Sequence, residues 1–416
     1  MFKRYIISTF VCFLSAFAHA QYHEIFSNSI RSLQVVCGDK WLDMPIMKLH
    51  DNSSTNTMNI AFDDLSHTYR RFTYSIEHCE ADWTTTESLF ASDYIDGFST
   101  DNTIDDIEES INTNTLYTHY RLSVPNEKLK IKLSGNYKLN IIDDNSGEEI
   151  LSACFMVVEP IVNIGMDISS NTDIDTNKSH QQIDMTVSYN GLRVTDPSTQ
   201  IKTVILQNGR WDNARTNIKP QYITTNGLQW THNRNLIFDA GNEYHKFEIL
   251  ATSHATLGVD NIGWDGKNYH AYLFPNEPRP NYLYDEDANG AFYIRNSDNI
   301  ENDITSDYMF VHFTLNSSSP VSGDVYINGA WTYDRFLPEY KLQYNEIKKC
   351  YEANILLKLG YYSYQYVMLD NDRKPTIMPT EGSFFQTENK YQALIYYRGQ
   401  TDRTDRLVGY KEIQFK

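Results

Sequence analysis

Apolar and polar residues alternate in many short runs along this chain, and turn-forming residues separate the runs. Tyr137–Ile142 and Asp324–Ile327 are two examples. A period of two places one face of a run in a core and the other in water, which is typical of β-strands. Helical periodicity is sparse, and the acidic stretch Asp101–Ser110 is expected to be a solvated loop in preference to a short surface helix. The pattern therefore predicts an all-β protein.

Strand spacing of this kind favours stacked sandwiches over one large sheet, because strongly twisted open sheets seldom exceed about ten strands. A first boundary is expected near Pro160, where an apolar run ends in a proline that resists continued pairing. The polar stretch 295–305 predicts an exposed linker as the second boundary. We therefore expect tandem immunoglobulin-like β-sandwich domains: an N-terminal domain over residues 21–160, a middle β-rich domain over 161–300 and a C-terminal domain over 301–416.

The first twenty residues have the features of a secretory signal peptide. Lys3 and Arg4 are basic, residues 5–17 are mostly apolar, and Ala18-His19-Ala20 has the small residues of a cleavage site. The apolar run is too short to cross about 30 Å of hydrocarbon as a helix. We expect residues 1–20 to be removed and the exported chain to begin at Gln21.

Charge narrows the range of partners. The chain has 54 acidic and 36 basic residues, a formal net charge of −18. A field of this sign repels phosphate backbones and anionic lipid surfaces, which argues against nucleic-acid binding and direct membrane insertion. No later stretch approaches about 18 consecutive apolar residues, so retention at a membrane would require a protein partner.

The cysteines give no sign of redox or zinc chemistry. An even number in an exported chain permits disulfides. Cys37 and Cys154 border apolar runs, however, which is typical of buried strand thiols. No Cys-x-x-Cys or Cys/His spacing suggests a dithiol or a zinc site. Whether disulfides form stays open for the four cysteines of the exported chain, Cys37, Cys79, Cys154 and Cys350.

One motif resembles the start of a calcium site. Asp285-x-Asp287-x-Asn289-Gly290 copies the opening of an EF-hand loop. The twelfth position is Asn296, where a bidentate glutamate is required, and a strand is expected where a helix should begin. A turn at Asn289-Gly290 explains the same residues, so we expect no metal and no other cofactor.

No set of residues predicts catalysis. The nucleophile-elbow, zinc-protease and phosphate-loop motifs are missing. His78 and Cys79 are neighbours in an expected strand and therefore point to opposite faces, so they do not readily share a proton. The same geometry argues against the acid pairs Asp63-Asp64 and Asp105-Asp106, and His119 is expected to be a packed strand residue. We expect no enzymatic activity.

Two polar, turn-rich segments stand between apolar strands, Gln207–Ala214 and Ala240–Glu243. Asn and Gly accept the positive φ of tight turns, so both segments are expected to be hairpin loops. Polar side chains in them can also tie loops together through hydrogen bonds. The candidates for such ties are Arg210 with Asp212, and Asn213 with Glu243.

Together with other segments in the same order, these two resemble the plug protein family of the Bacteroidota type IX secretion system. The likeness runs from about residue 30 to the C-terminus, which is nearly the whole exported chain. The other segments that carry it are His78–Trp83, Ser134–Tyr137, Asp287–Gly290, Leu357–Tyr362 and Thr387–Tyr391.

This resemblance implies a periplasmic protein that closes the periplasmic mouth of a very large outer-membrane barrel, through which type IX substrates leave. The barrel would be the protein partner that holds it at the outer membrane, and this chain would be one monomeric subunit of the resulting hetero-complex. The sequence does not locate the face that contacts the barrel.

The aromatic C-terminal part leaves a second class of function open. Trp331 and the run Gly360–Tyr366 resemble immunoglobulin-like domains that bind α-glucans, where exposed rings stack on sugars. Alternation puts Tyr362, Tyr364 and Tyr366 on one strand face. The alternative is that these rings and Trp331 fill a sandwich core, and we favour core and protein interface over a glycan-binding module.

Overall fold

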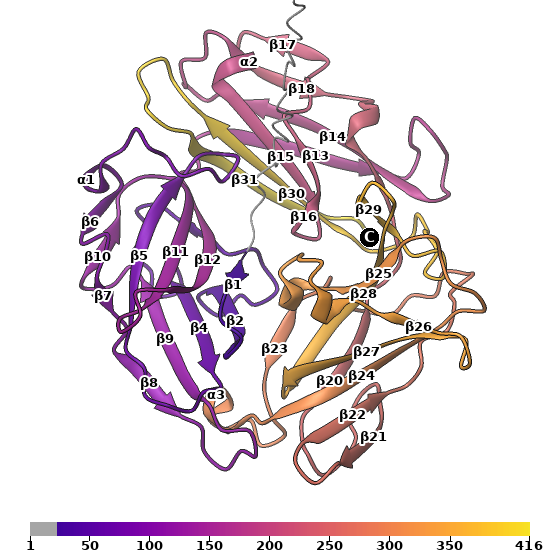
Figure 1. Cartoon of the computed structure of the whole chain (residues 1–416). Coiled ribbons are helices and arrows are strands. Elements are labelled where there is room, and N and C mark those ends of the chain that lie inside the picture. Colours follow the sequence, from indigo (N-terminus) through magenta and orange to yellow (C-terminus); the bar gives the residue numbers. More distant parts are fainter. Residues whose placement is uncertain (1–22) are drawn as a thin grey trace, which may run out of the picture.

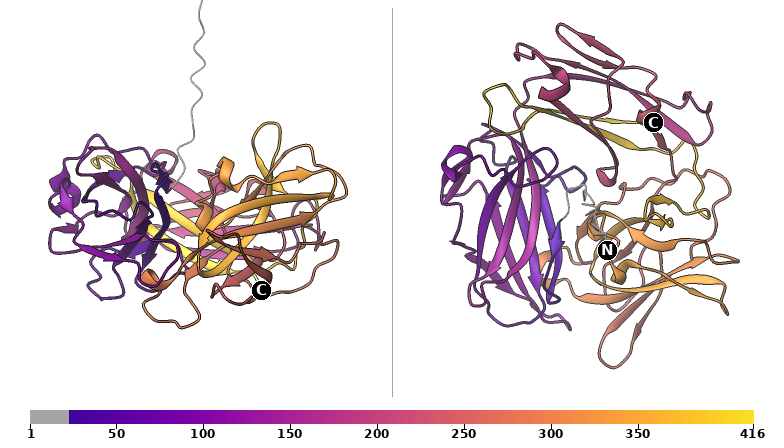
Figure 2. Two further views of the ribbon diagram at one scale, coloured as in Figure 1. Left: turned by 60° about the horizontal axis from the view of Figure 1, so that its bottom comes forward. Right: turned by 45° about the horizontal axis from the view of Figure 1, so that its top comes forward.

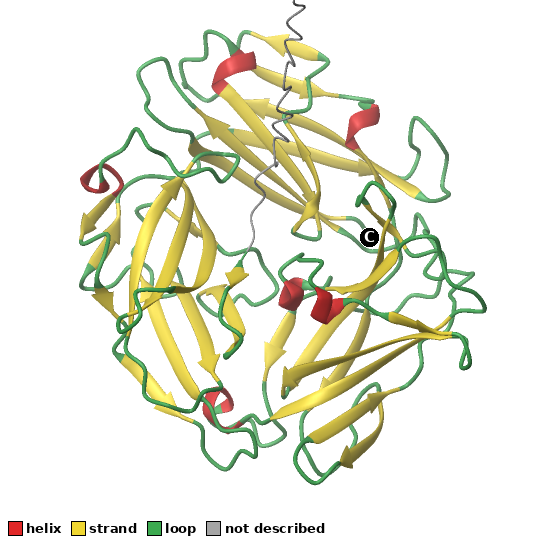
Figure 3. Ribbon diagram, viewed as in Figure 1, coloured by secondary structure: helices red, strands yellow, loops and turns green. Residues whose placement is uncertain are grey.

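The computed structural model describes residues 23–416, so the expected signal peptide, residues 1–20, lies outside the described residues. Strands and loops dominate the chain, and the few helices are single turns (Figure 3). The predicted all-β fold is confirmed. The strands form three β-sandwiches, which are called the first, second and third sandwich below.

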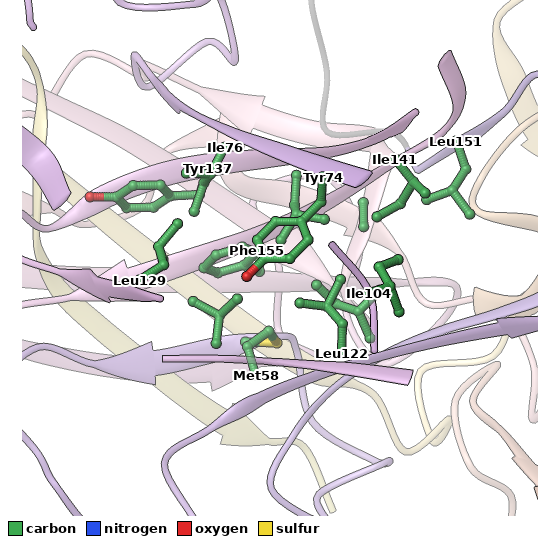
Figure 4. Packing of buried hydrophobic residues seen from close by; sticks show 14 of the residues in the cluster. Met58, Tyr74, Ile76, Ile104, Leu122, Leu129, Tyr137, Ile141, Leu151 and Phe155 are labelled. Carbon is green, nitrogen blue, oxygen red and sulfur yellow. The ribbon is translucent and has the colours of Figure 1, made fainter. Parts of the chain in front are cut away.

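The first sandwich contains residues 23–159 and packs two sheets over one core. Tyr74, Tyr137 and Phe155 are aromatic members of this core (Figure 4). The larger sheet has the order β1 (Glu24–Ile25), β12 (Glu149–Val158), β11 (Gly135–Asp143), β5 (Phe72–Cys79) and β7 (Asn102–Thr103), with β3 (Ile46–Lys48) parallel to β12. The facing sheet has the order β2 (Ile30–Cys37), β4 (Met58–Asp64), β9 (Thr118–Val124) and β8 (Asp106–Glu109), while β10 (Leu129–Ile131), β6 (Ile95–Gly97) and α1 (Ala91–Tyr94) lie at one end.

The second sandwich combines a middle part of the chain with its last strands. One sheet has the order β13 (Asn163–Ser169), β14 (His180–Ser188), β18 (Gly227–Trp230) and β17 (Tyr222–Thr224), with β19 (Ile237–Asp239) also on β14. The other has the order β16 (Arg210–Thr216), β15 (Ile201–Gln207), β30 (Lys390–Tyr397) and β31 (Arg406–Gln414). The single turns α2 (Pro197–Gln200) and η1 (Arg234–Leu236) precede β15 and β19.

The third sandwich is built around the long strand β28 (Gly360–Leu369). This strand pairs with β20 (His245–Ile249), β23 (Phe292–Ile294), β25 (Asp324–Asn328) and β29 (Pro375–Ile377). The other sheet has the order β21 (Val259–Trp264), β22 (Tyr269–Leu273), β24 (Tyr308–Asn316), β27 (Cys350–Lys358) and β26 (Gln343–Asn345). The single turns are α3 (Asn302–Thr305), η2 (Ala330–Thr332) and η3 (Pro338–Tyr340).

The three sandwiches surround a common centre, toward which the β15–β16 hairpin points (Figure 1). Two further views show the same side-by-side arrangement (Figure 2). The end of β12 at Val158 coincides with the expected first boundary. Strand pairs cross the expected second boundary at residue 300, because β15 pairs with β30 and β20 pairs with β28. The ranges 161–300 and 301–416 therefore each supply strands to two sandwiches, and their standing as separate folding units stays a prediction.

Three local expectations differ from the structure. Residues 106–109, expected in a solvated loop, form the edge strand β8, where Asp106 and Glu108 pair with Arg121 of β9. The segment 295–305, expected as an exposed linker, connects β23 and β24 of one sandwich and buries Ile304. Ala240–Glu243 is not a hairpin loop, since β19 before it and β20 after it belong to different sandwiches.

The pairing across residue 300 predicts how fragments behave. A fragment of residues 301–416 lacks β20, β22 and β23, which pair with β28 and β24, so we expect no cooperative thermal transition by circular dichroism. A fragment of residues 23–159 keeps both of its sheets and is expected to unfold cooperatively. Cooperative melting of the 301–416 fragment would contradict the strand pairing described above.

Candidate functional site

The turn of the β15–β16 hairpin lies at the centre of the molecule. Gln207 pairs with Arg210, and Asn208 and Gly209 between them have φ of 55° and 70°. Positive φ at both central residues is the geometry of a tight hairpin turn that suits strand twist, so the predicted hairpin at 207–214 is confirmed. A Cβ on Gly209 would lie 3.6 Å from the Met44 side chain of the first sandwich, so the turn touches that sandwich.

Arg210 and Asp212 form the tie that the sequence suggested. Residues two apart in a strand share a face, and here the guanidinium forks onto the carboxylate, with Nε–Oδ1 at 2.9 Å and Nη2–Oδ2 at 2.5 Å. Their side chains are 14% and 3% exposed. Burial lowers the pKa of Arg210, but Asp212 more than offsets this and holds the pKa above its usual value. The second suggested tie does not form, because Asn213 donates to Gln207 and Glu243 accepts from Tyr282.

Asp334 of the third sandwich meets the same hairpin. Its carboxylate accepts hydrogen bonds from the Trp211 backbone N–H at 3.3 Å and from the Asn328 amide at 3.1 Å. Burial, followed by the negative charge of Asp212, raises the pKa of Asp334 to about 7. A raised pKa favours the neutral form of Asp334, and that form limits charge repulsion beside Asp212.

A cavity of about 150 Å³ lies where the three sandwiches meet. Trp41 of the first sandwich, Arg210 of the second and Asn328 of the third all contribute to its lining. Sites for small molecules and cofactors usually enclose about 300–1,000 Å³. This junction cavity is therefore a gap in the packing of the three sandwiches, and it is too small for a substrate of ordinary size.

The contact between the first and second sandwiches contains an apolar cluster, beside which Tyr396 donates to Asn136 at 2.8 Å and Arg403 pairs with Asp93. Trp83 and Trp211 meet edge to face with ring centroids 5.6 Å apart. Met156 from β12 packs in the same cluster as Leu206 and Leu394, all with no exposed surface. Full burial of one such side chain is worth about 1.5–3 kcal/mol, so this cluster makes a firm contact.

The contact between the first and third sandwiches contains a buried pair of opposite charges. Lys358 Nζ lies 2.6 Å from Asp63 Oδ2, and neither side chain is exposed. Tyr308 donates to the same oxygen at 2.6 Å, and His119 Nδ1 lies 2.6 Å from Asp63 Oδ1. Lys358 also lies 4.2 Å from the centre of the Tyr117 ring.

The pKa shifts of this pair follow from the same contacts. Burial would raise the pKa of Asp63, but Lys358 and His119 outweigh it and the pKa is lowered. Burial lowers the pKa of Lys358, and the Asp63 charge only partly opposes it. A charge in such a place is tolerated only while its partner stays in position.

Besides the hairpin contact at Asp334, the second and third sandwiches are joined by two connecting segments, 240–244 and 378–389. They lie side by side, since the Phe384 backbone N–H donates to the Gly241 carbonyl at 2.8 Å. The Asn389 amide donates to the Ala240 carbonyl at 2.8 Å and to Gln181 at 3.0 Å. The chain therefore passes between these sandwiches twice, and hydrogen bonds join the two passages.

The residues considered for catalysis are separated or engaged in packing. His78 bonds Thr86 at 3.0 Å inside the first sandwich, while Cys79 lies in the apolar cluster toward the second. Burial lowers the pKa of His78 to about 4 and raises that of Cys79 to about 12, opposite to the needs of a base and a nucleophile. His119 is a packed strand residue, as predicted, and its partner is Asp63.

The cysteines are packed inside strands, and the acidic residues of the calcium-like motif are engaged in hydrogen bonds and an ion pair. Cys37, Cys79, Cys154 and Cys350 are all buried in strands. Asp285 pairs with Lys246 at 2.6 Å, and Asp287 accepts from the backbone N–H groups of Tyr244 and Asn289. Among residues 23–416, no group of three or more His, Cys, Asp or Glu side chains is arranged to hold a metal ion. Over the same residues, no helix has the length and apolar character to cross a membrane.

The aromatic residues that suggested sugar stacking are inside the third sandwich. Trp331 is 5% exposed, and Tyr362, Tyr364 and Tyr366 are at most 2% exposed. The predicted shared face of the three tyrosines is confirmed, and it is the core face. Rings in this position have no free face for a sugar.

The Asp63–Lys358 pair is not indicated by any motif in the sequence. The two residues are 295 positions apart, and nothing local links them. One signal was present, because Lys358 interrupts the apolar run from Ile355 to Leu359. Lysine is almost never fully buried unless it is paired, so a lysine in such a run indicates a hidden acidic partner.

Comparison with known proteins gives two clear likenesses. The family model described as "Type 9 secretion system plug protein 1st domain" matches residues 30–159. The crystal structure of a hypothetical protein from Parabacteroides merdae aligns with 38% identity, over 95% of this chain and 99% of its own, with a TM-score of 0.90. The C-terminal domain of AspA, an antigen I/II-family protein of Streptococcus pyogenes, aligns over 92% of this chain and 99% of its own at 11% identity. Its TM-score of 0.17 does not indicate a shared fold. No match is found among curated proteins.

The buried charge pair predicts a large effect on stability. Lys358→Met leaves the Asp63 carboxylate buried without its cation, so we expect a loss of about 3–5 kcal/mol in the free energy of unfolding, measured by urea denaturation. Lys348→Met is the matched control, because the Lys348–Glu352 pair is 64% and 37% exposed and is worth at most about 1 kcal/mol. Equal losses in the two variants would contradict a special role for Lys358.

The hairpin pair predicts a second loss. Arg210→Ala or Asp212→Ala leaves one buried charge without its partner, so we expect the free energy of unfolding to fall by about 3 kcal/mol and the melting temperature with it. Arg71→Ala serves as control, since the Arg71–Asp144 pair is 58% and 43% exposed. An unchanged melting curve together with lost partner binding would instead make Arg210 and Asp212 part of a binding interface.

Proposed function

Because the chain belongs to the plug protein family of the type IX secretion system, its role lies in type IX secretion, and we propose that it is the plug itself. In this proposal it is a non-enzymatic periplasmic subunit that seals the periplasmic end of the outer-membrane translocon pore between transport events. Its partner is the large β-barrel translocon, with which it forms a hetero-complex as a single copy.

The observation that carries this proposal is the joining of three sandwiches into one body. A seal must be wider than the aperture and must not deform under load. Each sandwich here contacts the other two, through the Trp83–Trp211 cluster, the Asp63–Lys358 pair and the joined connecting segments. A compact chain of this length has a radius of gyration of about 22 Å, so the joined sandwiches form a broad body.

The surface chemistry supports a protein partner. The excess of acidic residues keeps the protein away from anionic lipid, while long-range attraction can still guide it to a basic protein surface. An interface that must open for each transport event is expected to be of moderate size and partly polar. The buried positions of Trp331 and the β28 tyrosines give no support to the alternative, a glycan-binding module.

The proposal predicts a leak that runs through the barrel. Cells without this protein are expected to admit large antibiotics or dyes that intact cells exclude, because nothing then blocks an aperture wide enough for folded cargo. Cells that lack both this protein and the barrel are the control, and they should exclude these compounds again. Normal exclusion in the single deletion, combined with saturable binding of soluble glucans by the purified protein, would favour carbohydrate recognition instead.

A further inference from the structure

A long loop without regular structure crosses the third sandwich. Residues 274–291 connect β22 to β23, and their only bridge to a strand is Asn276 with Leu315. Loops longer than about 12–15 residues without secondary structure are uncommon in compact domains and are usually functional when they are ordered. Pro275, Pro278 and Pro280 restrict the backbone of its first half.

The first half of this loop is fixed by buried polar groups. Asn276 accepts hydrogen bonds from the hydroxyls of Tyr364 and Tyr366 at 2.8 and 2.7 Å. Arg279 binds the Glu381 carboxylate, whose side chain is 4% exposed, and donates to the Glu243 carbonyl at 2.7 Å. These contacts fix the first half of the loop to strand β28 and to the two connecting segments, 240–244 and 378–389.

The second half is fixed in the same manner. Tyr282 donates to Glu243 Oε1 at 2.6 Å, and Asp287 accepts from the Tyr244 backbone N–H. Lys246 Nζ lies 2.6 Å from Asp285 Oδ1. The two halves are thus pinned on either side of residues 283 and 284.

Between these anchors the loop exposes two large apolar side chains. Leu283 is 80% exposed and Tyr284 is 53% exposed. Burying a leucine side chain is worth about 1.5–3 kcal/mol. Because the fixed loop keeps Leu283 outside the protein core, this free energy is available for binding a partner. Because the backbone is held already, little conformational entropy would be lost on binding.

Acidic residues adjoin this apolar tip. Asp285 and Glu286 follow it directly in the sequence and are exposed, and Asp285 is paired with Lys246. The pKa of Tyr284 is raised, first by desolvation and then by the charges of Glu388 and Glu286, so carboxylates from two segments of the chain act on this ring. A complementary surface would place basic side chains around an apolar pocket.

We propose that loop 274–291 is the contact by which this protein docks on the translocon barrel, with Leu283 and Tyr284 inserted into an apolar pocket that lysine or arginine side chains surround. The inference rests on the proposed function and adds the site and the chemistry of the partner. The exposed apolar tip provides the binding energy, and the acidic rim selects a basic pocket.

The test is recovery of the barrel with tagged full-length protein from envelopes in mild detergent. Leu283→Asp is expected to lower recovery at least fivefold relative to wild type, because a charge would enter the apolar pocket. Ile347→Asp is the matched control, since Ile347 is 94% exposed on the turn between β26 and β27 and its change adds the same charge. Recovery with Ile347→Asp should equal wild type, and both variants should keep the wild-type unfolding midpoint.

A second pair of variants tests the acidic rim. Glu286→Lys is expected to lower recovery at least threefold, whereas Glu346→Lys, an exposed change of the same charge next to Ile347, should not. Wild-type recovery with Leu283→Asp would overturn the inference and leave the proposed function standing. Failure of the wild-type protein to recover the barrel would overturn the proposed partner and this inference together.

Discussion

Asp63 and Lys358 face each other across the boundary between the first and third sandwiches, and neither side chain reaches water. A charge pair in this position is favourable only over a narrow range of distances, because separation leaves each ion desolvated and alone. The two sandwiches are therefore held in one relative position. The connecting segments fix the second sandwich against the third, and the apolar cluster around Trp83 fixes the second sandwich against the first. Loss of one contact would loosen the other two.

Local features of the fold were predictable from the sequence. The alternation around Tyr362 correctly gave the core face of β28, and Asn208-Gly209 correctly gave a hairpin turn. Features that depend on distant residues were not. Whether Ala240–Glu243 returns the chain to its own sheet or carries it to another sandwich depends on where β20 finds a partner, and that partner is about 115 residues away in sequence. For the same reason, the sequence of residues 106–109 does not indicate strand β8, because this strand depends on its pairing with β9, which carries Arg121.

The candidate site divides in the same way. Arg210 and Asp212 are two residues apart in one strand, so their pairing follows from strand geometry and was suggested from the sequence. Asp334 joins them from the third sandwich, and no pattern near residue 334 indicates this. Some polar side chains of types common in active sites, such as His119 and Glu381, instead form hydrogen bonds that join segments of the chain. Buried polar networks of this type favour one arrangement of the sandwiches over others.

The order of the strands has a consequence for how the chain comes into being. The second sandwich is completed by β30 and β31, the last two strands of the chain, whereas its first strands follow directly on the first sandwich. During synthesis from the N-terminus onward, the first sandwich can form as soon as its residues are available, but β15 must wait for β30 through about 180 intervening residues. For that interval the apolar face of β15 has no cover and is open to association with other unfinished chains. The entire chain must therefore be present before the second sandwich can close, so a truncated product would leave an unfinished sheet.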